Sequence, residues 1–443
     1  MDIGFISLGC AKNQVDTEIM MAILKENGHK IVNTVERSDL VIINTCGFIN
    51  DAKEEAIDTI IEMGQLKEQG VIDYIIATGC LSQRYAKELM AEMPELDAVV
   101  GIGDYHSIGQ VVEQVVKGDK IVLVNKPPEV FIEKGPRILS TPKGLAYLKI
   151  TEGCNNKCTY CAIPLIRGKL RSNSLESLID EARFLVKAGV KELVLIGQDT
   201  ASYGQDIGYE QGLSNLLERL VEIPDLEWIR VMYIHPAHLT ADIIKIMAKE
   251  DKIIPYIDLP IQHSSSSILK SMNRKHSVED LSLIIHNLRE NIKDLVLRTT
   301  VMVGFPGERE ADFMELYDFV EKIAFDWLGV FKFTAEKGTP AYLLPNQLDE
   351  DIKEERLNKI LKLQKEITRQ KNINRINSKQ KILVSSRIAP NLYIGRGYFQ
   401  APEVDGVTMI KSNCALEPGA FAEVTLKAVR NYDMIGEFDS ESP

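Results

Sequence analysis

Three cysteines, Cys154, Cys158 and Cys161, stand close together in a C-x₃-C-x₂-C arrangement. They follow an apolar run at 145–150 that predicts a buried β-strand, so their thiolates would gather in one tight loop at its carboxyl end. A structural zinc site normally closes with four ligands, and no fourth cysteine or histidine lies nearby in the sequence. Three thiolates instead suit a 4Fe–4S cluster with one open iron, which can bind a small molecule carrying an amino group and a carboxylate. Chance packing of three cysteines is the alternative, and the tight spacing argues against it.

Cys10, Cys46 and Cys80 share a different pattern, because each follows an apolar run with one residue between them. The three runs span residues 3–8, 40–44 and 74–78. They are continuous and rich in β-branched residues, which is typical of buried parallel strands. If these strands are neighbours, the three thiols meet at one edge of a sheet, where open α/β sheets bind ligands. Helices that begin after each cysteine would lower the thiol pKa values, and Asn44, Thr45 and Gly79 are expected to supply hydrogen bonds to cluster sulfurs.

A buried free cysteine often ends a strand simply as a small apolar side chain, and for one cysteine that interpretation would prevail. Three cysteines at the same position of successive strands favour a second three-thiolate cluster, whose open iron would bind exogenous sulfur. Cys414 is left over and is interpreted as structural. Seven cysteines in a chain of 443 residues without a signal peptide argue for metal binding rather than a disulfide framework.

The pattern of strands and helices predicts three domains and a linker: two α/β domains and one all-β domain. Residues 1–125 alternate apolar strands with amphipathic helices, for example at 16–26, which predicts a small open α/β sheet. Residues 126–143 contain four prolines, a linker signal. Residues 144–374 show six strand–helix repeats and a trailing charged helix, which predict a partial (βα)₆ barrel. Residues 375–443 give short strands with turn signals, which predict a small all-β barrel.

The net charge of −12 is concentrated in residues 1–125, which hold 10 Lys and Arg against 20 Asp and Glu. Such a field repels phosphates and attracts a basic partner, although an acidic surface also serves solubility alone. No run approaches the ~20 apolar residues of a membrane span, and no signal peptide precedes the first strand. We therefore expect a cytoplasmic chain without a membrane partner.

The cysteine loop, with Tyr160 before its third cysteine and a βα barrel beneath, resembles the radical-SAM superfamily. Together with the N-terminal cysteine domain and a C-terminal segment similar to a TRAM domain, the whole chain resembles the methylthiotransferase family of radical-SAM enzymes. In that family an open iron chelates S-adenosyl-L-methionine (SAM), and electron transfer cleaves it to a 5′-deoxyadenosyl radical. The resemblance thus implies two 4Fe–4S clusters and SAM as cofactors, with Tyr160 shielding one cluster or merely packing.

Several segments resemble the branch of the family that modifies a ribosomal protein. The matching segments are 197–204, 230–236, 262–264, 298–308 and 400–406. That branch adds a methylthio group to the β-carbon of an aspartate in the small-subunit ribosomal protein of the decoding centre. The branch that modifies tRNA adenosines uses the same chemistry and is the alternative.

The resemblance also implies residues that contact SAM. Gln198 and Asp199 end the second barrel strand and are expected to hold the SAM amino group, with a loop cap by Asp199 as the alternative. Arg298 is expected to pair with the SAM carboxylate or the substrate aspartate, with a structural ion pair as the alternative. Gly304 and Gly307 lie in a strand-to-helix turn that is expected to cradle adenine, and helix capping would explain the same residues.

The charge of this chain helps to distinguish between the two candidate substrates, a ribosomal protein and tRNA. Residues 376–443 carry 7 Lys and Arg and 8 Asp and Glu, so they lack the basic footprint that a tRNA enzyme normally displays. A basic ribosomal protein, free or assembled into the small subunit, would be steered toward an acidic enzyme. A local basic groove would still suit tRNA, so that alternative stays open. An electron-transfer protein is disfavoured because it has no use for a six-repeat barrel. A flavodoxin- or ferredoxin-type reductant is expected, and the sequence does not identify the sulfur donor.

Overall fold

The computed structural model describes residues 1–132 and 135–438 in two compact units. The first unit comprises residues 1–140, 151–157 and 161–172, and the second comprises 141–150, 158–160 and 173–443. Residues 133–134 of the predicted linker and 439–443 of the predicted β-barrel lie outside the described residues. Among the helices that the structure describes, none is both long enough and apolar enough to cross a bilayer.

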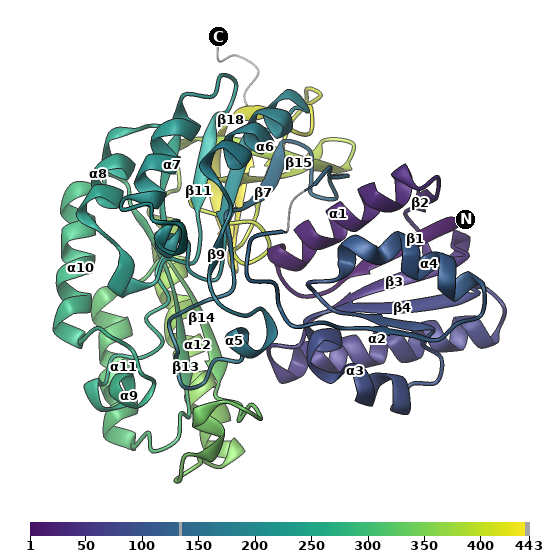
Figure 1. The fold of residues 1–443 in the computed structure, drawn as a ribbon. Helices are drawn as coiled ribbons and strands as arrows, with labels where there is room; N and C mark the ends of the chain where they lie inside the picture. Colours follow the sequence, from purple (N-terminus) through teal and green to yellow (C-terminus); the bar gives the residue numbers. More distant parts are fainter. Residues whose placement is uncertain (133–134, 439–443) are drawn as a thin grey trace. The chain divides into compact units, whose positions relative to one another are not determined.

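A six-stranded parallel sheet forms the centre of the first unit, in the order β2-β1-β3-β4-β5-β6 (Figure 1). Its strands are β1 (Asp2–Ser7), β2 (Lys30–Val32), β3 (Leu40–Thr45), β4 (Tyr74–Gly79), β5 (Ala98–Val100) and β6 (Ile121–Leu123). Helices α2 (Asn50–Glu68) and α3 (Cys80–Glu92) cover one face, and α1 (Ala11–Glu26) and α4 (Ile108–Val116) cover the other. Every residue of β3 is buried, as expected for a parallel strand covered on both faces.

Three short elements complete the first unit around the radical-SAM-type cysteine loop. They are β8 (Thr151–Glu152), β9 (Arg171–Ser172) and α5 (Ile163–Ile166), with β8 and β9 paired antiparallel. The end of the predicted linker is tied to α1, because Arg137 Nη2 lies 2.6 Å from Glu18 Oε2 and Ser140 N donates to Glu18 Oε1.

A second six-stranded parallel sheet lies in the second unit, in the order β14-β13-β12-β11-β10-β7. Its strands are β7 (Leu145–Lys149), β10 (Glu192–Ile196), β11 (Trp228–Val231), β12 (Ile253–Asp258), β13 (Val296–Val303) and β14 (Trp327–Lys332). Its helices are α6 (Leu175–Lys187), α7 (Gly212–Val221), α8 (Ala241–Lys249), α9 (Ser266–Ser271), α10 (Val278–Asn291), α11 (Glu310–Ile323) and α12 (Glu350–Ile373). The strands follow one another in chain order, which is the arrangement of successive βα repeats. The predicted six-repeat α/β class is confirmed.

The C-terminal segment forms a closed five-stranded barrel, as predicted. Its strands are β15 (Lys379–Ala389), β16 (Leu392–Gly397), β17 (Thr408–Lys411), β18 (Phe421–Arg430) and β19 (Asp433–Glu437). A buried ionic network joins this barrel to the parallel sheet of the same unit. Glu192 of β10 lies 2.8 Å from Arg230 Nε of β11 and 2.8 Å from Arg396 Nη2 of β16.

The segment 400–406 lies in the loop that joins β16 to β17, which pair antiparallel. Gln400 is fully buried, with Oε1 accepting hydrogen bonds from Gly397 N and Thr408 Oγ1. Asp405 accepts a 2.7 Å hydrogen bond from Tyr256 OH of β12. The segment therefore attaches the barrel to the sheet, because its polar groups find partners there.

Candidate functional site

The N-terminal cysteines lie at the carboxyl edge of the first sheet. Cys10 is the residue before α1, Cys46 follows β3, and Cys80 is the first residue of α3, directly after β4. Strands β1, β3 and β4 are adjacent and parallel, so their carboxyl ends meet at one edge. The predicted convergence of the three strand ends is confirmed.

Two glycines allow the segments that carry these cysteines to approach one another. Gly9 has φ of +93°, and a Cβ added there would lie 2.8 Å from Cys46 Cβ and 3.2 Å from Cys46 Sγ. A Cβ added at Gly47 would lie 2.7 Å from the backbone nitrogen of Leu81, the residue after Cys80. A larger residue at either position would push two of the three segments apart.

The electrostatics of this triad differ from cysteine to cysteine. Burial opposes ionisation of Cys10, but the positive charges of Lys12 and Arg167 lower the pKa of its thiol. Burial raises the pKa of Cys46 and raises that of Cys80 to about 11, although Arg167 opposes both shifts. The expected lowering by helix dipoles is therefore wrong for Cys46 and Cys80, because loss of water outweighs it. Iron ligation would itself displace these protons.

The side chains of Asn44 and Thr45 are committed to other protein groups. Asn44 Nδ2 donates to Asn13 O at 2.8 Å and to Thr17 Oγ1 at 2.9 Å, and Thr45 Oγ1 donates to Thr78 O at 2.5 Å. Since these bonds use both amide protons and the hydroxyl proton, the two side chains do not donate to cluster sulfurs. These bonds instead fix the ends of β3 and β4 against α1. Donation by the backbone of these residues or of Gly79 stays a prediction.

The N-terminal donor set fits a 4Fe–4S cluster better than a single ion. Sulfurs around one tetrahedral zinc ion at ~2.3 Å would lie about 3.8 Å apart. In the described part of the chain, three possible metal ligands have ligand atoms within 4.8 Å of one another: Asp199, His235 and His238. The three cysteines do not form such a group, so at least two of their sulfurs lie more than 4.8 Å apart. A cluster carries its cysteines at its corners and suits this wider spacing. Cys10, Cys46 and Cys80 would hold it.

The second cysteine loop follows β7, and all three of its cysteines are half-buried. Cys154 Sγ accepts a 3.5 Å hydrogen bond from the backbone nitrogen of Asn156. Cys158 Sγ lies 3.7 Å from Nη1 of Arg274, a residue of the second unit like Cys158 itself. Donors directed at sulfur stabilise thiolate ligands, so this loop also fits a cluster. Cys154, Cys158 and Cys161 would hold it.

Tyr160 packs against an apolar cluster in the second unit that includes Met272, Phe305 and Phe333. The packing interpretation of this residue is therefore confirmed. A shielding role toward a cluster stays a prediction.

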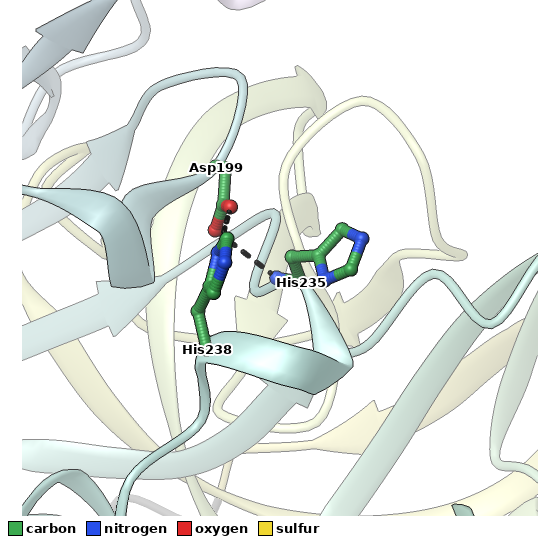
Figure 2. A group of neighbouring side chains, drawn as sticks. All are labelled: Asp199, His235 and His238. Carbon is green, nitrogen blue, oxygen red and sulfur yellow. Dashed lines mark hydrogen bonds and ion pairs between the residues drawn. The ribbon is translucent and has the colours of Figure 1, made fainter. Parts of the chain in front are cut away.

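Asp199 lies in a hydrogen-bonded group with two histidines (Figure 2). Its carboxylate accepts from His238 Nδ1 at 2.6 Å, from Ser202 Oγ at 2.7 Å and from His235 N at 3.2 Å. His235 Nδ1 in turn accepts from Ala237 N. These bonds are those of a loop cap, the alternative interpretation of Asp199. Gln198, half-buried beside it, and Asp199 remain predicted SAM contacts.

Arg298 of β13 is engaged by two carboxylates of the chain. Its Nη1 lies 2.9 Å from Asp258 Oδ1 and its Nε lies 3.5 Å from Asp405 Oδ1. The structural ion pair considered as the alternative is therefore present. Binding of the SAM carboxylate or a substrate aspartate by Arg298 would require it to exchange one of these partners.

Gly304 and Gly307 both have positive φ, of +75° and +83°, in the turn between β13 and α11. The Glu308 carboxylate accepts from Gly304 N at 2.8 Å and from Phe305 N at 3.3 Å. Arg356 Nη1 lies 2.7 Å from the other oxygen of Glu308. The turn is thus held by an internal carboxylate, and an adenine contact by these glycines stays a prediction.

Sequence reasoning missed two arginines that face cysteine sulfurs, Arg167 and Arg274. Arg167 Nη2 lies 3.4 Å from Cys80 Sγ within the first unit. The sequence held one weak signal for it: Arg167 directly follows the apolar run 162–166, at the start of a basic stretch that also holds Lys169 and Arg171. An arginine that is drawn into an apolar core usually has a specific partner. No comparable signal marks Arg274.

Comparison with known proteins agrees with this architecture. Family profiles match residues 2–101 to the uncharacterized protein family UPF0004, residues 148–320 to the radical SAM superfamily, and residues 376–438 to the TRAM domain. A solved structure of the radical SAM methyltransferase TsrM from Kitasatospora setae has a TM-score of 0.57 and 14% identity, covering 77% of this chain and 76% of that one. This likeness concerns the fold alone. The fold and the cysteine loop define a radical-SAM enzyme, which implies SAM and a 4Fe–4S cluster as cofactors.

Whole-length relatives narrow the class further. The chain is 56% identical over 438 residues to ribosomal protein uS12 methylthiotransferase RimO of Syntrophomonas wolfei, covering 99% of this chain and 100% of that protein. It is 46% identical to the RimO protein of Clostridioides difficile, covering 99% of this chain and 98% of the relative. This chain belongs to the RimO family of radical-SAM methylthiotransferases.

Proposed function

We propose that this chain adds a methylthio group to the β-carbon of an aspartate in ribosomal protein uS12. The observation that carries the proposal is the convergence of Cys10, Cys46 and Cys80 at one sheet edge, in a chain that also has a radical-SAM domain. Cleavage of SAM requires one cluster, so a second three-thiolate site provides a place for sulfur. The names of the curated relatives support uS12 as the substrate.

The two triads have separate roles in this proposal. Cys154, Cys158 and Cys161 hold the cluster that binds SAM, and the N-terminal triad holds a second 4Fe–4S cluster. When bound, these cofactors supply reductive cleavage of SAM, hydrogen abstraction from the substrate carbon, and delivery of sulfur and a methyl group. The chain itself positions the reactants and excludes water. The proposed SAM contacts are Tyr160, Gln198, Asp199, Arg298, Gly304 and Gly307.

Separate cysteine variants test these roles. With dithionite under anaerobic conditions, Cys158→Ala should abolish release of 5′-deoxyadenosine. Cys46→Ala should retain that release and lose the methylthio product, because the SAM-binding triad is intact. The cluster assignment fails if Cys46→Ala still methylthiolates uS12, or if Cys158→Ala still releases 5′-deoxyadenosine.

Mass spectrometry of a deletion strain tests the substrate. Ribosomal protein uS12 should lose the mass of its methylthio group, and a plasmid copy of the gene should restore it. If uS12 is unchanged while a tRNA adenosine loses a methylthio group, the tRNA alternative replaces this proposal. The excess of acidic residues in 1–125 supports the basic protein substrate, which would place the enzyme in the cytoplasm. A flavodoxin- or ferredoxin-type protein is the proposed electron donor.

A further inference from the structure

Arg167 lies beside Cys80 in the first unit and is 1% exposed. Its Nη2 atom donates to Cys80 Sγ at 3.4 Å and to Asn13 Oδ1 at 2.6 Å. Its Nη1 atom lies 2.5 Å from Glu152 Oε2. A guanidinium that has lost its water is stable only with such partners, so these contacts fix its orientation.

The surrounding carboxylates explain why the guanidinium points at a sulfur. Glu152 engages Nη1, and Asp16 Oδ2 lies 3.4 Å from Nη2. Both carboxylates are buried, with side-chain exposures of 1% and 5%. Because the two anions hold the planar fork, Arg167 cannot turn away from Cys80 without leaving a buried charge unpaired.

Packing fixes the backbone of the same segment. Ala162 and Ile166 form a buried apolar cluster with Cys80 and Ile102. Arg167 directly follows α5, whose last residue is Ile166. The short segment from Cys161 to Arg167 therefore links a ligand of the SAM-binding triad to a donor for the N-terminal triad.

We propose that Arg167 is a positioning residue for the second cluster: it donates to the sulfur of Cys80 when the cluster is bound and thereby raises the cluster's reduction potential. The inference rests on the proposed second cluster. Hydrogen bonds to cluster sulfurs and nearby positive charge are established means of raising such potentials.

A raised potential suits the sulfur-transfer step. The new C–S bond takes one electron from the substrate radical and one from a sulfur lone pair. The second electron of that lone pair must therefore go to an acceptor. The adjacent iron–sulfur cluster of the proposed function can take it, and a donor on Cys80 makes that reduction easier.

The experiment measures the midpoint potential of the second cluster in the full-length chain carrying C154A, C158A and C161A, so that iron reports on the N-terminal triad. The double variant R167Q/E152Q removes Arg167 together with one paired carboxylate and keeps the net charge. The matched control is R137Q/E18Q, which removes another buried ion pair of the first unit, with 2.6 Å between Arg137 Nη2 and Glu18 Oε2.

At the parent's midpoint potential, the ratio of reduced to oxidised cluster should fall about threefold in R167Q/E152Q, or about 28 mV for a one-electron couple at ~59 mV per decade. R137Q/E18Q should keep the parent's potential. An unchanged potential in R167Q/E152Q, or an equal shift in R137Q/E18Q, overturns the role of Arg167. If R167Q/E152Q holds no iron, the potential of R167K is measured instead, because lysine keeps the positive charge but lacks the planar guanidinium. A more negative potential in R167K supports the role of Arg167, and an unchanged potential overturns it. A parent chain that holds no iron overturns the proposed second cluster itself.

Discussion

Replacing Gly9 by alanine tests whether the close approach of two chain segments makes the second cluster site. The new Cβ would lie 2.8 Å from Cys46 Cβ and 3.2 Å from Cys46 Sγ. Cys46 Cβ is bonded directly to the backbone, so rotation of the side chain cannot relieve the closer of these two contacts. Ordinary contact begins near 3.4 Å, so the Cys46 segment must shift by about 0.6 Å. The φ of +93° adds strain of about 1–2 kcal/mol for a residue with a Cβ.

Gly28→Ala is the matched control for this substitution. Gly28 lies in the same unit with φ of +86°, and a Cβ added there has nothing within 4 Å. Backbone strain should therefore lower the unfolding free energy of both variants by about 1–2 kcal/mol, measured in urea, and the overlap with Cys46 should lower that of Gly9→Ala further. Only Gly9→Ala should lose iron from the N-terminal triad, and its methylthio transfer should fall on the order of 10²-fold, as for other ~1 Å displacements of reacting groups. Release of 5′-deoxyadenosine should continue in both variants.

Two results would refute this reasoning. Gly9→Ala with the parent's iron content and the parent's methylthio transfer would show that the close approach is not needed. Equal iron loss in Gly28→Ala would show that backbone strain alone, and not the contact with Cys46, removes the cluster.

Two further predictions concern the second unit. Burial and, to a smaller extent, the charge of Arg274 lower the pKa of His276 from 6.5 to about 4. As the pH falls, the imidazole is therefore protonated in the unfolded chain before it is protonated in the folded chain. Stability should fall by on the order of 3 kcal/mol as the pH drops from 6.5 to 4, and His276→Gln should remove this part of the pH dependence in urea unfolding; an identical loss in the variant would contradict it. Glu192→Gln should cost about 3–5 kcal/mol, because it leaves the buried guanidinium groups of Arg230 and Arg396 without their anion. Urea unfolding at pH 7.5 measures this cost, and a loss below about 1 kcal/mol would show that the network is replaceable.

The positions of the N-terminal cysteines could be predicted because strand patterns are local. Continuous β-branched runs identify buried parallel strands, and a residue that follows such a run must lie at the carboxyl edge of its sheet. The pKa values could not be predicted in this way. The helix that begins at Cys80 can be predicted from the sequence, whereas the burial that raises the pKa of the Cys80 thiol to about 11 depends on packing between distant segments. The same holds for Asp405, whose partners Tyr256 and Arg298 are far away in the chain.

Helix α1 shows most clearly why the contacts around the N-terminal cysteines could not all be predicted from sequence patterns. Its polar residues Asn13, Asp16 and Glu18 read as the solvent side of an amphipathic helix, yet all three are buried. Asn13 Nδ2 donates to the carbonyl of Thr45, Asp16 pairs with Arg167, and Glu18 pairs with Arg137, which is also buried. Each partner lies far along the chain, so no local pattern reveals it. Buried polar groups persist only where their partners are fixed, and here those partners hold the strand ends and the arginine around the N-terminal triad. Polar residues of α1 therefore help to position the N-terminal cysteines. The spacing of apolar residues, from which amphipathic helices are predicted, gives no information about these polar contacts.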